Sequence, residues 1–140
     1  AFLERIDVRF PGRQVENRSI FRQGPNTSIY DLAYSGTLDV ATRNPDERYR
    51  YLGFMASIVV PYYTVYHLAR LTDNDERIGF VFEGDDLTVA REIGAELEVT
   101  FPGYVLMPEE VGRAIVPGVR TAFKVAGAAT VYDCLLSDHW

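Results

Sequence analysis

The 140-residue sequence has one cysteine, one lysine and two histidines, and this scarcity excludes several kinds of site. A lone cysteine cannot form a disulfide within the chain, so we expect no disulfide scaffold and a reducing compartment. Cys134 lies in an apolar, strand-like run, where a buried, inert thiol is the simpler interpretation than a nucleophile with His139 as its base. Because a zinc or iron site needs three or four converging ligands, His67 and His139 do not predict one. We therefore expect no catalytic residues, no metal and no cofactor.

Phosphate-binding loops and calcium-binding loops are also missing. Gly79 and Gly84 have neither a GxGxxG frame nor a following Lys-Ser/Thr pair. The acidic runs 73–76 and 83–86 offer oxygen ligands, but neither has the alternating order of an EF-hand loop. Acidic turns explain both runs, and nothing selects two carboxylates as a paired acid and base.

Charged side chains, in contrast, are numerous, and the two signs are unevenly distributed along the sequence. Residues 1–70 carry nine basic and seven acidic side chains, whereas residues 71–140 carry five and thirteen. Within residues 73–98 there are nine carboxylates and two arginines. Such a negative field repels phosphate backbones and attracts basic protein surfaces. The sequence thus predicts no nucleic-acid partner and favours a protein partner with a basic surface.

We expect the partner-binding site in this acidic stretch. Exposed acids raise the association rate and select the partner but contribute little affinity one by one, so apolar anchors are needed beside them. The acidic members of the predicted site are Asp73, Asp75, Glu76, Glu83, Asp85 and Asp86, and its apolar members are Phe80, Phe82 and Leu87.

The apolar pattern predicts one α+β domain over residues 1–140. Alternating residues predict a strand over 2–10, a Pro-Gly turn and a second strand over 14–21, followed by a helical turn over 28–34. In the C-terminal half we expect strands over 78–82, 96–101, 104–107, 119–125 and 128–136, and a short helix over 108–115. Residues 87–93 are either a helix or the return strand of a hairpin, and the β-favouring Leu-Thr-Val run favours the hairpin.

A long central helix is expected over residues 46–70. Asn44 can cap it, Pro45 suits its first position, and tyrosines and aliphatic residues recur every three or four positions. Pro61 would kink it. The nineteen residues between Arg50 and Arg70 carry no formal charge, but their tyrosines, proline and histidine argue against a membrane span. We expect a mostly antiparallel sheet packed against this Pro-kinked helix.

The tyrosines of this segment leave two further functions open. One is a small-molecule pocket, of a ligand-binding protein or an enzyme, lined by Tyr51, Tyr62, Tyr63 and Tyr66. The other is a homodimer that pairs aromatic surfaces.

Several stretches resemble small immunity proteins encoded beside bacterial polymorphic toxins. The similar segments are NTSIYDLAYSG at 26–36, RYRYL at 48–52, PYYTVY at 61–66, PEEVG at 108–112 and TVYDCL at 130–135. The resemblance implies a non-enzymatic, cytoplasmic inhibitor that binds one cognate toxin and blocks its active site. It assigns no catalytic residue and no contact residue.

Overall fold

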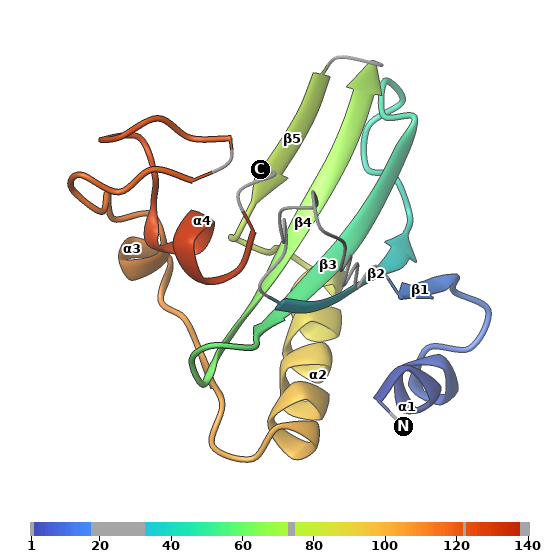
Figure 1. Cartoon of the computed structure of the whole chain (residues 1–140). Helices are drawn as coiled ribbons and strands as arrows, with labels where there is room; N and C mark the ends of the chain where they lie inside the picture. Colours follow the sequence, from blue (N-terminus) through green and yellow to red (C-terminus); the bar gives the residue numbers. More distant parts are fainter. Residues whose placement is uncertain (1, 18–32, 73–74, 122, 138–140) are drawn as a thin grey trace, which may run out of the picture.

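The computed structural model describes residues 2–17, 33–72, 75–121 and 123–137. Six of its strands form one sheet, accompanied by helices, so the predicted α+β class with a mostly antiparallel sheet is confirmed. Strands β1 to β5 follow one another as an antiparallel meander (Figure 1), and β6 pairs with β4 in parallel. The elements are α1 (Phe2–Arg9), β1 (Val15–Asn17), β2 (Ala33–Val40), β3 (Tyr49–Ser57), β4 (Tyr62–Thr72), β5 (Asp75–Gly79), α2 (Asp85–Thr100), β6 (Val105–Leu106), α3 (Glu109–Gly112) and α4 (Val131–Leu135).

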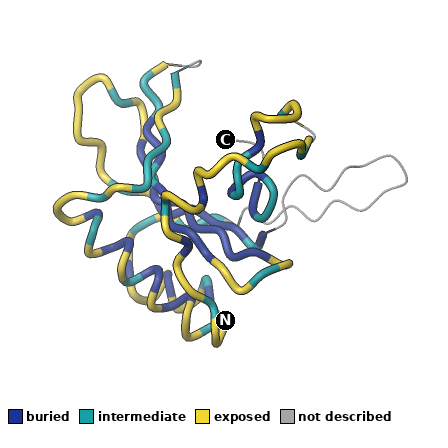
Figure 2. Tube along the Cα trace, turned by 90° about the vertical axis from the view of Figure 1, so that its left-hand side faces the viewer, coloured by how far each residue is buried: buried dark blue, intermediate teal, exposed yellow. Residues whose placement is uncertain are grey.

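Both faces of the sheet are covered, and each face has its own apolar cluster. Along β3, Leu52, Phe54 and Ala56 belong to the cluster shared with α1 and α2, whereas Met55 belongs to the cluster shared with Tyr132 of α4. This division follows from the alternation of side chains along a strand. Figure 2 shows the result as buried tube through the strands and along one side of α2.

The long Pro-kinked helix predicted over 46–70 is wrong: the segment forms β3, a turn and β4. Because both faces of these strands are buried, apolar residues occur at odd and even positions alike and imitate a helical spacing. Pro61 lies in this turn, directly before β4, instead of kinking a helix. The Ser57 hydroxyl accepts hydrogen bonds from the backbone N–H groups of Val59 and Val60, at 3.2 and 3.4 Å, and so stabilises that turn.

The strand predicted over 2–10 is also wrong, since these residues form α1. Phe2, Ile6 and Phe10 are four positions apart, which places them on one side of a helix, and all three are buried. Val8 would share their face in a strand, but its side chain points away and is 81% exposed. Residues four positions apart also share a face in a strand, so the sequence spacing fits both a helix and a strand. The burial of Phe10 and the exposure of Val8 identify the helix.

The strands predicted over 87–93 and 96–101 are replaced by the single helix α2. Two aspartates occupy its first turn, where the helix dipole favours negative charge. Val89, Ile93 and Leu97 lie on its buried side, at intervals of four residues. The helical alternative for 87–93 is therefore the correct one.

The remaining predictions have mixed outcomes. Strand β1 falls within the predicted strand 14–21, α3 within the predicted helix 108–115, and β6 within the predicted strand 104–107. Strand β5 ends at Gly79, so the strand predicted over 78–82 begins and ends too late. No strand forms in the described part of 119–125, and 128–136 holds α4, which begins with a capping box between Thr130 and Asp133. The helical turn predicted over 28–34 lies largely outside the described residues, and β2 begins at Ala33.

None of the helices in the described part of the chain has the length and apolar character that a membrane span requires.

Candidate functional site

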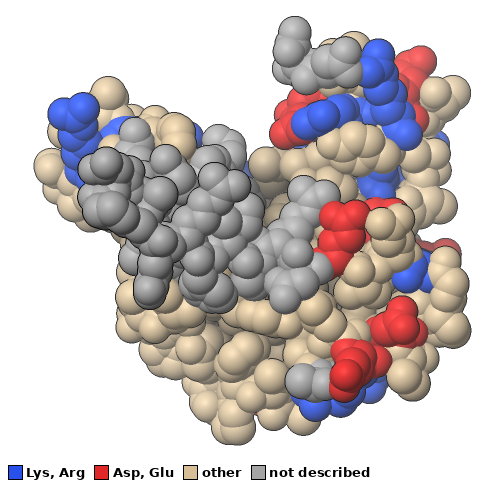
Figure 3. Space-filling model, turned by 45° about the vertical axis from the view of Figure 1, so that its right-hand side comes forward, with Lys and Arg blue, Asp and Glu red and all other residues tan. Residues whose placement is uncertain are grey.

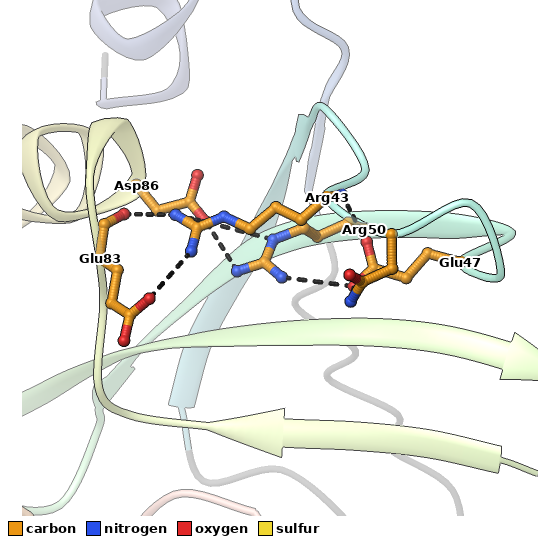
Figure 4. Close-up of polar contacts among 6 residues, drawn as sticks. Arg43, Glu47, Arg50, Glu83 and Asp86 are labelled. Carbon is orange, nitrogen blue, oxygen red and sulfur yellow. Dashed lines mark hydrogen bonds and ion pairs between the residues drawn. The ribbon is translucent and has the colours of Figure 1, made fainter.

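Asp86, one of the predicted partner-binding acids, is a buried structural residue. Its Oδ2 accepts hydrogen bonds from Arg50 Nη2 at 2.7 Å and Arg50 Nε at 3.1 Å, and Arg43 Nη2 lies 3.2 Å away (Figure 4). The side chains of Arg50 and Asp86 are only 8% and 10% exposed. A buried carboxylate is tolerated when a cation and hydrogen bonds satisfy it, so this cluster ties the start of α2 to β3.

Two more carboxylates of the acidic stretch are paired with arginines from the first half of the chain. Glu96 accepts a hydrogen bond from Arg5 Nε at 2.8 Å and another from Arg9 Nη2 at 2.7 Å, which joins α2 to α1. On the sheet, Glu76 of β5 forms an ion pair with Arg70 of β4. The acidic half of the sequence thus folds against basic residues of the other half, and acidic and basic side chains are interleaved on the face shown in Figure 3.

The other predicted acids keep part of their charge at the surface. Glu83 is 82% exposed and lies 3.7 Å from Arg43 Nη1. Asp85 is exposed at the start of α2, and Asp75 on β5 lies 4.0 Å from Arg77. Asp73 lies outside the described residues. The predicted acids therefore do not gather into one unopposed negative face.

The three predicted apolar anchors, in contrast, converge. Phe80, Phe82 and Leu87 line one open groove with a volume of about 620 Å³. The groove lies at the outer edge of β4, between α2 and the segment that leads into α3. Its lining consists of Tyr63, Thr64, Val65, Phe80, Val81, Phe82, Leu87, Ala90, Arg91, Gly94, Ala95, Glu98, Leu106, Met107, Pro108, Glu109 and Tyr132.

One polar contact marks the α2 side of the groove. The Tyr63 hydroxyl donates a hydrogen bond to Glu98 Oε1 at 2.7 Å. Burial raises the pKa of Tyr63, and the hydrogen bond to the Glu98 carboxylate raises it further, so the phenol stays protonated. Gly94 gives this hydroxyl room, because a Cβ at that position would lie 3.0 Å from it. The groove thus carries a protonated phenol hydrogen-bonded to an exposed carboxylate.

Tyr132 forms the opposite wall from α4. Its ring stacks on Phe80 with a centroid separation of 4.7 Å and an interplanar angle of 12°. Gly112 of α3 lies directly against the ring, where a Cβ would come within 2.0 Å of Cζ. Burial raises the pKa of the Tyr132 phenol. Packing from both sides therefore holds this wall in place.

His67, on β4, is half-buried beside Phe82, with their ring centroids 5.6 Å apart. Burial lowers the pKa of its imidazole, and the positive charge of Arg50 lowers it further. His67 is therefore neutral near pH 7.

The pocket predicted from Tyr51, Tyr62, Tyr63 and Tyr66 does not form as a unit. Only Tyr63 lines the groove. Tyr51 stacks with Tyr49, their centroids 5.9 Å apart, and Tyr66 is buried against the backbone of Gly53. Alternation along the strands separates the four rings, which a helix would have brought closer.

Sequence reasoning missed the contribution of α2 to the groove. Leu87, Ala90, Arg91, Gly94 and Glu98 recur at intervals of three or four residues, as one face of a helix does. This helical spacing is visible in the sequence, but a strand over 87–93 would place the same residues on both faces of a sheet. Tyr132 and Met107 could not have been found in this way, because only the tertiary fold brings them to β4.

Comparison with known proteins finds no matching family model, no matching curated protein and no matching solved structure.

Proposed function

We propose that this chain is a non-catalytic inhibitor that binds another protein, and that the partner docks in the groove beside β4. The observation that carries the proposal is the convergence of Phe80, Phe82 and Leu87 on one open groove. Aromatic and aliphatic side chains grouped in a concave surface are the usual source of affinity in protein interfaces. The resemblance to toxin immunity proteins supports the same class of function, with a bacterial toxin as the partner.

The acidic residues have a smaller role in this proposal than their number suggests. Asp86, Glu96 and Glu76 form ion pairs with arginines, so their charge is largely neutralised within the fold. Glu83 and Asp85 remain exposed next to the Phe82 end of the groove. They are suited to accelerating the approach of a basic partner, while the groove supplies the affinity.

The test compares two arginine substitutions on α2. Ala95 is exposed and lines the groove, whereas Val99 is exposed, four residues along the same helix, and does not line it. The partner is the protein recovered with the full chain from its source cells, and its affinity is measured by calorimetry. We expect Ala95→Arg to weaken binding by at least about tenfold, whereas Val99→Arg leaves it unchanged. Equal affinities for the two variants would contradict docking in the groove.

A small-molecule site is the second candidate, because a groove of about 620 Å³ with mostly apolar walls has the size of a ligand pocket. The Tyr63–Glu98 pair would supply its polar contact. Native mass spectrometry of the chain from its source cells distinguishes the two candidates. A bound small molecule, lost in Ala95→Arg, favours the ligand site, and a stoichiometric protein complex favours the inhibitor.

A further inference from the structure

The outer edge of β4 is covered in two separate pieces. Strand β6 pairs with Tyr62 and Tyr63, and strand β5 pairs with β4 from His67 onward. In the part of the chain that the structure describes, no strand is registered with residues 64–66 on this edge. A gap therefore interrupts the edge of an otherwise continuous sheet.

Within this gap, the backbone of Val65 points outward. Met107 N–H donates to the Tyr63 carbonyl at 2.8 Å, which shows that the polar groups of Tyr63 face the outer edge. Because these groups alternate along a strand, the N–H and C=O of Val65 face the same edge. Among the described residues, neither group has a hydrogen-bond partner.

The sequence explains why neither neighbouring strand fills the gap. Pro108 follows Met107, and there the chain leaves the edge of β4 and enters α3, so β6 is not extended toward Val65. Strand β5 ends at Gly79, after which the chain turns toward α2. Val65 is consequently left at the floor of the groove, where it is 6% exposed.

Two charges on α2 flank the same gap. Arg91 and Glu98 both line the groove, and neither belongs to an ion pair among the described residues. They are seven residues apart, which on a helix is about 10.5 Å. Residues four positions apart on an extended chain lie about 13 Å apart and on the same face, so the long charged side chains of one short strand reach from one charge to the other.

We propose that the groove accepts a short extended segment of the partner protein, whose main chain pairs with Val65 as an added strand. A basic side chain of the segment meets Glu98, and an acidic side chain meets Arg91. The distance from Tyr63 to His67, about 13 Å along the strand, limits the paired part to about four residues. A loop tip or a chain terminus fits this limit, and main-chain pairing of this kind is a known mode of peptide recognition. This inference rests on the proposed function, since it specifies how the partner occupies the groove.

Two capped peptides of opposite charge order test the proposal: acetyl-Lys-Val-Ile-Val-Glu-amide and acetyl-Glu-Val-Ile-Val-Lys-amide. Each is titrated to ~5 mM into the isotopically labelled full chain, and the backbone amide signals are followed by NMR. We expect the Val65 amide to shift, and one charge order to bind at least about threefold more tightly than the other. The charge-swapped double variant, Arg91→Glu with Glu98→Arg, should reverse that preference.

Main-chain pairing has its own signature. Methylating the peptide nitrogens one at a time should weaken binding by about tenfold at alternate positions only, because every second N–H faces β4. Binding that ignores methylation, or no shift at Val65 with either peptide, would overturn the proposal. If N-acetylvaline methylamide binds as well as the peptides, the groove takes a small amide ligand, and the proposal is likewise overturned.

Two proline variants test the edge in the protein itself. Val65→Pro removes an N–H that points away from β3, so the sheet should persist while peptide and partner binding weaken at least about tenfold. Thr64→Pro removes an N–H that points toward β3 and should prevent cooperative folding. Loss of partner binding in Ala95→Arg but not in Val65→Pro would overturn strand addition and leave the proposed function intact. Full binding in Ala95→Arg would instead refute the proposed function.

Discussion

The charged residues on the two sides of α2 differ in whether they are buried in ion pairs. On the side facing α1 and β3, Asp86 and Glu96 are buried, and each contacts two arginines. On the side facing the groove, Arg91 and Glu98 have no ion-pair partner among the described residues. Within this acidic stretch, therefore, some charges hold the fold together and others remain available to a ligand. Net charge along the sequence does not distinguish the two kinds.

The largest effect is expected at the buried pair. Arg50→Met leaves the Asp86 carboxylate buried with one arginine in place of two, and we expect a loss of about 3 kcal/mol in the free energy of unfolding. Urea denaturation measures it. The double variant Arg50→Met with Asp86→Leu should recover part of the loss, because the uncompensated Asp86 charge is gone while Glu47, 3.7 Å from Arg50, still loses its partner. If the double variant is no more stable than Arg50→Met alone, Arg50 and Asp86 contribute more to stability than the neutralisation of each other's charge.

A smaller effect sharpens the comparison between the two sides of the helix. Glu96→Ala removes two charged hydrogen bonds to α1 and should cost about 1–2 kcal/mol. Glu98→Ala, two positions along the same helix, removes one hydrogen bond, from the Tyr63 hydroxyl to an exposed carboxylate, and should cost less than about 1 kcal/mol. Thermal unfolding compares the variants, and hydrogen exchange in α1 should accelerate only in Glu96→Ala. Equal losses of stability in the two variants would contradict the expected difference between the two sides of α2.

The smallest effect concerns the pH dependence of stability, through His67 beside the groove. Its folded-state pKa is lowered by burial and by Arg50, so the unfolded chain binds a proton more readily than the folded chain does. The stability due to neutral His67 is complete above its unfolded pKa of 6.5 and is lost as the pH falls below that value toward the folded pKa. Because solvent screens a half-buried group, the loss should stay below about 1 kcal/mol.

Denaturation between about pH 5.5 and 7 checks this prediction, in a range where most carboxylates remain ionised. His67→Gln should flatten the slope in that range, and the wild-type chain should retain it. A slope unchanged in His67→Gln would assign the pH dependence to another group.

The parts of the fold that the sequence predicted correctly are those with local causes. The α3 segment begins after Pro108 with two glutamates in its first turn, and that signal needs no distant partner. The turns at Gly12 and Gly103 are likewise local, because both follow a proline and adopt a positive φ. For the candidate site, the same local reasoning identified Phe80, Phe82 and Leu87 as apolar anchors near one another in the chain.

The predictions that failed depend on which faces are buried. In β3 and β4 both faces are covered, so the apolar residues lose the alternation that marks a strand. In α1, Phe2, Ile6 and Phe10 satisfy two periodicities at once, and only the burial of that side against the core selects the helix.

The sequence alone determined the α+β class, the proline-glycine turns and the excess of acidic residues in the second half. The tertiary structure decided which of those acids remain available, because the arginine partners of Asp86 and Glu96 come from positions 36 to 91 residues away. It also decided that Val65 lies at an open strand edge, since pairing depends on where two other strands end. Local patterns record what each residue prefers, whereas neutralisation and strand pairing require segments that only folding brings together.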